Sequence, residues 1–111
     1  MANLEQLAIL KKGVTLWNKW RKENPNTWID LSEASLPGAN LSRANLQGAD
    51  LRNANLFRAD LRRANLWGDI LIGANFLDTN LSGADLRYAN LSGANLDRAT
   101  LIEGSMGVAV N

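Results

Sequence analysis

The chain carries two hydrophobic patterns, and the first, over residues 3–22, is that of an amphipathic α-helix. Apolar side chains recur at spacings of three and four residues, and lysine, arginine and asparagine occupy much of the remaining surface. The apolar stripe consists of Leu7, Leu10, Val14 and Trp17. Asn3, followed three residues later by Gln6, resembles a helix-capping pair, and Pro25 is a stop signal.

Gly13 interrupts this helical pattern. A glycine costs about 1 kcal/mol in a helix interior, so the pattern is compatible with one kinked helix or with two short helices. Ile9, Leu16 and Trp20 widen the apolar surface beyond a single stripe, and such a helix needs another surface to lie on. We therefore interpret residues 1–27 as a helical leader.

The second pattern begins after Trp28, where one large apolar residue falls at every fifth position. Two places before this central residue stands Ala in 12 of the 16 pentads, and one place before it stands Asn or Asp in 12 of the 16. The two positions after the centre vary and often end in Gly. The repeat extends over residues 28–108 and leaves 109–111 as a tail. The central residues are Leu31, Leu36, Leu41, Leu46, Leu51, Leu56, Leu61, Leu66, Leu71, Phe76, Leu81, Leu86, Leu91, Leu96, Leu101 and Met106.

A period of five residues fits neither an α-helix nor a flat strand. In a helix, at roughly 100° per residue, the leucines would spread over every face, and in a strand an odd period sends successive leucines to opposite faces. The chain must therefore turn once per pentad, with Ala and Leu pointing inward and the last two residues forming a corner. Four turns of roughly 90° close a coil, and coils stack at about 4.8 Å, the spacing of strands. We expect Leu and Ala to fill the interior completely.

These pentads resemble the pentapeptide-repeat family. Residues 39–43 (Ala-Asn-Leu-Ser-Arg) and 84–88 (Ala-Asp-Leu-Arg-Tyr) carry its pattern, and residues 13–25 resemble the segment that precedes such repeats in many cyanobacterial members. The resemblance implies an all-β solenoid, a right-handed quadrilateral β-helix of about four coils, here capped by an N-terminal amphipathic α-helix. Because the biochemical roles of the family are mostly unassigned, the resemblance predicts the fold more than the function.

Composition excludes most catalytic chemistry. The chain has no Cys and no His, which excludes disulfides, thiolate zinc sites, thiol nucleophiles and imidazole catalysis. A filled interior provides no cleft that tunes carboxylates, so we expect no enzyme activity, no cofactor and no metal site. No apolar run approaches the length of a membrane helix, and the first residues lack the positive charge of a signal peptide. We therefore expect a cytoplasmic protein that does not bind a membrane.

The variable corner positions offer the candidate interaction surface. Exposed aromatic and aliphatic side chains anchor protein interfaces, so the first hypothesis is a non-catalytic structural module that binds an unknown protein partner. Arg87 stands 20 residues after Trp67, and we expect it to lie over the Trp67 ring as a cation–π pair. The large apolar residues at these positions are Phe57, Leu77, Trp67 and Ile72.

The arginines of the corners suggest an anion-facing surface. Arg58, Asp78 and Arg98 share one column, and their alternating charges predict an ion-pair ladder. A second group of arginines stacks as a patch, which favours weak binding of a polyanion. The net charge of +1 makes high affinity for nucleic acid unexpected. This patch consists of Arg43, Arg62 and Arg63.

A third hypothesis is the DNA-mimic role of those members of the resembled family that protect topoisomerases from inhibitors. Mimicry of DNA needs an acidic surface along a long rod. The free outer positions instead hold seven arginines against four acids. Four coils reach only about 19 Å. Both the sign of the charge and the length of the rod disfavour this role.

The pentad of residues 69–73 breaks the repeat, because Asp69 takes the small inward position and Ile70 takes the polar position. An isolated buried carboxylate is unfavourable. Either the wall deforms locally and Asp69 bonds to backbone amides, or the pKa of Asp69 rises. We interpret the pentad as a local deformation, and a contact site for a partner is the alternative.

A solenoid exposes unpaired strand edges at both ends. The leader is the natural cover for the first coil, and we expect Trp17, Trp20 and Trp28 to pack there. No helix follows the last coil. We therefore expect a second copy to cover that end, giving an end-to-end homodimer, an arrangement also known in the resembled family.

Overall fold

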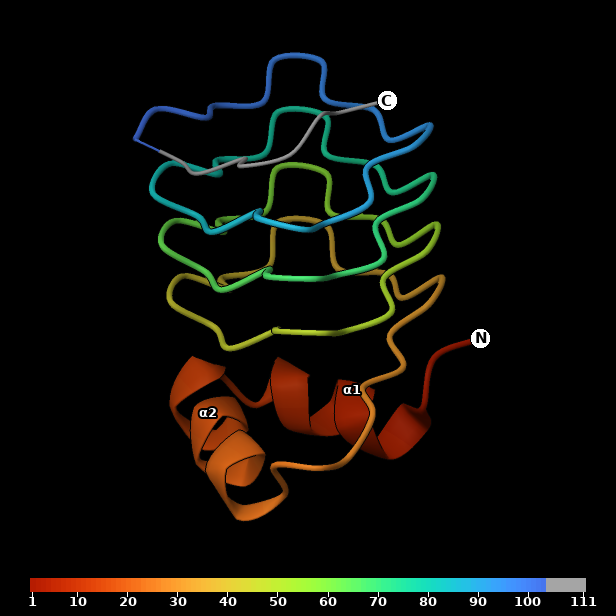
Figure 1. Cartoon of the computed structure of the whole chain (residues 1–111), viewed down its shortest axis with the longest axis vertical. Helices are drawn as coiled ribbons and strands as arrows, with labels where there is room; N and C mark the ends of the chain where they lie inside the picture. Colours follow the sequence, from red (N-terminus) through yellow and green to blue (C-terminus); the bar gives the residue numbers. More distant parts are fainter. Residues whose placement is uncertain (104–111) are drawn as a thin grey trace.

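The computed structural model describes residues 1–103 and places two short helices beneath a stack of coils (Figure 1). Helix α1 spans Leu4–Lys11 and helix α2 spans Val14–Glu23. The break between them lies at Gly13, whose φ of 122° is a conformation that residues with a side chain rarely adopt. The leader is therefore two helices. No helix among the described residues is long and apolar enough to span a bilayer.

Helix α1 begins at the predicted cap, but only half of the capping pair forms. The Asn3 side chain accepts a hydrogen bond from the Gln6 N–H at 3.1 Å. The Gln6 side chain does not return to Asn3. It donates to the Trp28 carbonyl at 2.9 Å and accepts from the Asp30 N–H at 2.8 Å. This carboxamide therefore joins α1 to the first coil.

After the leader, the backbone repeats its path every 20 residues. Each residue at the Asn/Asp position pairs in parallel with the residue 20 positions later, as Asn40 pairs with Asp60. The Asp60 N–H donates to the Ala39 carbonyl at 2.9 Å, and the Leu41 N–H donates to the Asp60 carbonyl at 2.8 Å. Pairing is limited to these single-residue bridges, so within residues 1–103 the coils stack without any longer strand.

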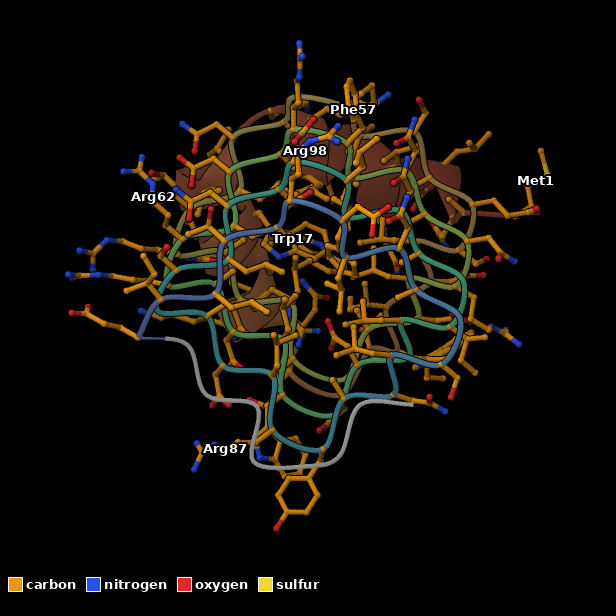
Figure 2. All side chains as sticks on the ribbon, turned by 90° about the horizontal axis from the view of Figure 1, so that it is seen from above. Met1, Trp17, Phe57, Arg62, Arg87 and Arg98 are labelled. Carbon is orange, nitrogen blue, oxygen red and sulfur yellow. The ribbon has the colours of Figure 1, made fainter. Side chains whose placement is uncertain are left out.

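Four ladders of such bridges make four walls, which we number in chain order. The two residues after each central residue form a corner, and each corner takes the number of the wall that it follows. Figure 2 looks down the stack of walls. The central residues are Leu31, Leu51, Leu71 and Leu91 in wall 1; Leu36, Leu56, Phe76 and Leu96 in wall 2; Leu41, Leu61, Leu81 and Leu101 in wall 3; and Leu46, Leu66 and Leu86 in wall 4.

Each corner is a β-turn, as when the Ala64 N–H donates to the Leu61 carbonyl at 3.1 Å. The second turn residue has a positive φ at every corner from Glu33 to Glu103, as a type II turn requires. Glycine occupies six of these positions, and nine carry a side chain. The left-handed conformation costs about 1–2 kcal/mol for a residue with a side chain, so the stacked coils impose this conformation on nine residues.

The interior is filled by the inward Leu and Ala side chains, as the repeat predicts. Leu41, Leu61 and Leu81 share one column, and Leu61 has no exposed surface. Phe76 replaces Leu in wall 2 and is equally buried. Each buried Leu stabilises the fold by roughly 1.5–3 kcal/mol. Thr79, at an Ala position, donates its hydroxyl to the Leu56 carbonyl, so this buried hydroxyl has a hydrogen-bond partner.

The Asn and Asp side chains before the central residues are structural, as the sequence predicts. Their Oδ1 atoms accept a hydrogen bond from the N–H two residues later, as Asn80 accepts from Ser82 at 3.0 Å. This Asx turn leads the chain into the corner. Twelve pentads form the bond.

Two of the three predicted tryptophans pack between the leader and the first coil. Trp17 is fully buried and its indole N–H donates to the Asn45 carbonyl at 2.8 Å. The Trp20 ring centroid lies 5.3 Å from that of Trp17. The prediction for Trp28 is wrong, because this side chain is 58% exposed. Trp28 stands 20 residues before Gly48, in a corner position, and therefore points outward.

The other end of the stack falls partly beyond the described residues. The last pentad and the predicted homodimer contact involve residues 104–111, which lie outside the part of the chain that the structure describes.

Candidate docking surfaces

The structure does not bring the four predicted apolar residues together. Phe57 and Leu77 lie at corner 2, Ile72 lies at corner 1, and Trp67 lies at corner 4. Figure 2 shows Phe57 on the opposite side of the stack from Arg87, which shares corner 4 with Trp67. The predicted residues therefore belong to separate surfaces.

Corner 2 is only partly open. Phe57 and Leu77 are half-buried, and the Arg58 guanidinium lies 4.9 Å from the centroid of the Phe57 ring. Arg98 Nε lies 2.7 Å from Asp78 Oδ1, and this hydrogen bond holds the pKa of Asp78 below its usual value. Because Arg58 covers the ring instead of bonding to Asp78, the predicted ladder is reduced to one ion pair.

Corner 4 carries an exposed aromatic surface, which we call the aromatic corner and which consists of Trp28, Trp67 and Tyr88. Trp67 is 38% exposed and Tyr88 is 68% exposed, and their ring centroids lie 5.1 Å apart with the planes tilted by 53°. Tyr88 takes the place that we predicted for Arg87. The prediction for Arg87 is wrong because its guanidinium pairs with Asp85 at 2.9 Å instead.

A groove of about 560 Å³ lies between the aromatic corner and α2, and we call it the corner-4 groove. Its lining includes Trp28 and Trp67 together with the cationic Arg21 and Lys22 near the end of α2. Arg21 Nη2 donates to the Gln47 carbonyl at 2.7 Å, whereas its Nε is buried without a hydrogen-bond partner among the described residues. Aromatic rings beside an oriented guanidinium are typical of the residues that anchor protein interfaces.

Asp69 is buried in wall 1, next to corner 4 in the chain. Its Oδ1 accepts from the Ala49 N–H at 2.8 Å, and its Oδ2 has no partner among the described residues. Burial raises the pKa of Asp69 well above its usual value, although the Ala49 N–H and the charge of Arg21 oppose the rise. The wall does not deform, because Ile70 keeps both of its bridges. The predicted amide bond and the predicted pKa rise therefore occur together, and the predicted deformation is wrong.

The predicted arginine patch does assemble, at corner 3. Arg62 is held by Asp60, with Nη2 2.7 Å from Oδ2, and this bond lowers the pKa of Asp60. Arg43 and Arg63 have no acidic partner within 4.0 Å among residues 1–103. They line a shallow groove of about 390 Å³, which we call the corner-3 groove. Its lining residues are Ser42, Arg43, Arg62, Arg63, Ser82, Gly83 and Glu103.

These surfaces offer binding groups in open grooves. Within residues 1–103, no cluster of three or more acidic side chains is placed to hold a metal ion. The charged groups of corners 3 and 4 lie on the outside of a filled stack, where water screens them. The geometry therefore suits recognition of another molecule.

Comparison with known proteins identifies the family. The family model of pentapeptide repeats matches the chain in eight copies, over residues 27–63 and 71–101, which is more than half of the chain. The chain belongs to the pentapeptide repeat family. The match is interrupted at residues 64–70, which include both Asp69 and Ile70. A search of curated proteins found no match.

Solved structures of other pentapeptide repeat proteins are similar to this one. One from the thylakoid lumen of Arabidopsis thaliana is 33% identical with a TM-score of 0.71, over 74% of this chain and 57% of that protein. HetL, involved in heterocyst differentiation regulation in the cyanobacterium Nostoc, is 40% identical with a TM-score of 0.44, over 72% of this chain and 39% of HetL. This pentapeptide repeat protein therefore spans little more than half of the length of the first of these relatives.

Membership of the family confirms the coarse fold. Pentapeptide repeat proteins fold as right-handed quadrilateral β-helices. The repeat of 20 residues and the four ladders of this chain agree with that architecture. Pentapeptide repeat proteins are generally structural modules without enzymatic activity.

Sequence reasoning missed three residues of the corner-4 surface. Tyr88 was overlooked because Arg87, its neighbour, was assigned to the Trp67 ring. Trp28 was assigned to the core, although its place 20 residues before Gly48 marks a corner position. Arg21 gave no signal, because its position depends on how α2 lies against the first coil.

Proposed function

We propose that this pentapeptide repeat protein is a non-catalytic module that binds a protein partner at the aromatic corner. The observation that carries this proposal is the exposed, tilted pair of Trp67 and Tyr88 rings beside the corner-4 groove. Exposed aromatic rings bury a large area on association and are enriched among residues that dominate interface energetics. The general absence of enzymatic activity in the family supports the same proposal.

Affinity capture from the native cell tests it with two matched double variants. We expect Trp67→Ser with Tyr88→Ser to lose a partner that the wild-type protein captures. Phe57→Ser with Leu77→Ser removes apolar side chains from the opposite corner, and this variant should keep the partner. Circular dichroism shows whether both variants retain the fold. Retention of every partner by the first variant would contradict the proposal.

Weak binding of a polyanion at the corner-3 groove is a second candidate function. Arg43 and Arg63 favour it because neither has an acidic partner within residues 1–103. We expect Arg43→Ser with Arg63→Ser to weaken binding of the protein to heparin. Electrostatic binding falls as salt rises, so affinity that is unchanged between low and high salt excludes this mechanism.

The DNA-mimic role remains disfavoured. Asp60 and Asp85 are each bonded to an arginine two residues later, which neutralises acidic groups on the outer surface. We therefore expect excess protein to leave the supercoiling activity of a topoisomerase unchanged. The end-to-end homodimer and the cytoplasmic location stay predictions, and sedimentation as a monomer at high concentration would contradict the homodimer.

A further inference from the structure

The leader satisfies half of the open edge of the first coil. Asp30 and Asn45 occupy the bridge positions of walls 1 and 4, where no earlier coil is available for pairing. The Asp30 N–H donates to Gln6 Oε1 at 2.8 Å, and the Asn45 N–H donates to Asn18 Oδ1 at 2.8 Å. The carbonyls of both residues also accept hydrogen bonds from the leader. Two side-chain amides, the Asn3 N–H and the Trp17 indole N–H of the leader therefore act in place of a preceding coil.

The other half of the edge has no such partners. Ser35 and Asn40 occupy the bridge positions of walls 2 and 3, and their N–H and carbonyl groups make no hydrogen bond with residues 1–103. Both residues are exposed, whereas the two covered bridge residues are half-buried. In the next coil, the equivalent N–H of Asn55 donates to the Ala34 carbonyl at 2.9 Å. In each later coil, the N–H and carbonyl groups at these positions pair with the coil before. In the first coil, the same groups of Ser35 and Asn40 are available for pairing within the described residues.

A groove of about 810 Å³ adjoins these two residues, and we call it the N-terminal groove. It is lined by residues of walls 2 and 3 and their corners, and by the end of α1, Gly13 and the start of α2. Among residues 1–103, Lys11 is the only charged residue in the lining. Helix α2 begins at Val14, and Gly13 before it provides no side-chain cap, so the first N–H groups of α2 add to the positive potential. The larger apolar lining residues are Leu10, Val14, Leu36, Pro37 and Leu41.

We propose that the N-terminal groove binds an extended acidic peptide segment of a partner protein by β-augmentation. The main chain of the peptide pairs with Ser35 and Asn40, just as one coil pairs with the next. Its apolar side chains contact the lining of the groove, and a carboxylate lies near Lys11 and the start of α2. The two free bridge positions are five residues apart, so the bound segment bends around one corner as a pentad does.

A second copy of the solenoid does not fit this edge as well as a single segment. The end of a whole solenoid presents all four walls, but α1 and α2 lie beneath the first coil (Figure 1) and already bond to it at walls 1 and 4. A single peptide needs only walls 2 and 3. The N-terminal groove shares no lining residue with the corner-4 groove, so this inference does not rest on the proposed function.

Titration of the ¹⁵N-labelled full chain with a synthetic peptide tests the inference. The peptide Ala-Asp-Leu-Ser-Gly-Ala-Asp-Leu places two acidic residues five positions apart, as Ser35 and Asn40 are. At saturation we expect the amide resonances of Ser35 and Asn40 to shift and their hydrogen exchange to slow. Trp67 should not respond. The same peptide methylated at both Leu nitrogens, which would donate to the Ser35 and Asn40 carbonyls as Leu41 N–H donates to the Asp60 carbonyl, should not bind. Equal binding of the two peptides would overturn the proposal, as would shifts confined to other walls.

A pair of charge variants tests the acidic preference. Lys11→Glu should weaken binding of the acidic peptide roughly tenfold, a change typical of a charge contact worth about 1.4 kcal/mol. Lys19→Glu, an exposed α2 lysine outside the groove lining, is the matched control and should change affinity less than about twofold. Equal effects of the two variants would overturn the proposal. Self-association without peptide that Ser35→Pro abolishes would assign the edge to a second copy and would also overturn it.

Discussion

The walls and the corners of this solenoid place different demands on their residues. A wall position such as Leu61 lies inside a filled stack and contacts the same residue type in the coils on either side. A corner position such as Arg62 must only continue the turn, and its side chain lies in water. The walls therefore specify the fold of the family, whereas the corner side chains are free to vary.

Truncation of a wall residue should have the largest effect. Leu61→Ala removes buried methyl groups from a column that cannot collapse without moving its neighbours, so we expect a loss of about 2–5 kcal/mol in the free energy of unfolding. Arg62→Ala, the next residue, removes only an exposed ion pair and should cost less than about 1 kcal/mol. Urea denaturation measures both. Equal losses would contradict the assignment of inside and outside.

Substitution at a corner position should reduce stability where the backbone conformation favours glycine. Gly68 and Gly73 have φ of 70° and 69°, so Gly68→Ala should cost about 1–2 kcal/mol although the space around Gly68 is open. Gly73→Ala should cost slightly more, because its Cβ would meet the side-chain oxygen of Asn53, an exposed side chain that has to move away. Asn53→Ala should remove this additional cost in a double-mutant cycle. Independent effects of Gly73→Ala and Asn53→Ala would show that the contact is absent.

The polar residue of each pentad links wall and corner, and its loss should have an intermediate effect. Asn80→Ala removes the hydrogen bond to the Ser82 N–H and should cost about 0.5–1.5 kcal/mol. Asn80→Asp keeps an acceptor at the same place and should cost less. Thermal melting of the two variants measures the difference. A larger loss for Asn80→Asp would indicate that charge, not the Asx turn, governs this position.

Asp69 is a charged group inside a wall, and we expect its effect to depend on pH. Its pKa in the folded protein lies above the unfolded reference of 3.8. Below the pKa of the unfolded chain, the Asp69 carboxyl is protonated in both states and its contribution to stability is complete. This contribution is lost as pH rises through the pKa of the folded protein, where the buried carboxyl becomes charged. Melting temperatures measured from acid to neutral pH should show wild type losing stability relative to Asp69→Asn.

The carboxylates of Asp60, Asp78 and Asp85 have the opposite dependence. Their pKa values are lowered by bonded arginines, so their contribution is lost as pH falls. Both wild type and Asp69→Asn contain them, and their effect cancels in the difference. A difference that stays constant with pH would contradict the raised pKa of Asp69.

The walls could be predicted from the sequence because each physical demand recurs at a fixed spacing. A filled interior admits one large side chain per pentad, and the Asx turn needs Asn or Asp just before it, so both demands leave a period of five. The corners leave no such period. The Arg87 guanidinium has two possible partners, the Trp67 ring and the Asp85 carboxylate, and the repeat alone does not decide between them.

The N-terminal groove could not be predicted for a different reason. Which bridge residues of the first coil are covered depends on where α1 and α2 lie, and that follows from the break at Gly13 and the burial of Trp17. The leader sequence was compatible with one helix or two. Only the positions of Gln6 and Asn18 in the structure show that Ser35 and Asn40 remain uncovered.

Nuclear Overhauser contacts measured in solution test the coil most directly. A four-sided coil of 20 residues brings Asn40, Asp60 and Asn80 into one ladder, so backbone protons of residues 20 apart should show strong contacts along all four walls. Contacts between residues four apart, which the corner turns do not produce, should be confined to α1 and α2. A chain that shows such helical contacts beyond Trp28, or no contacts at the spacing of 20, would contradict the solenoid.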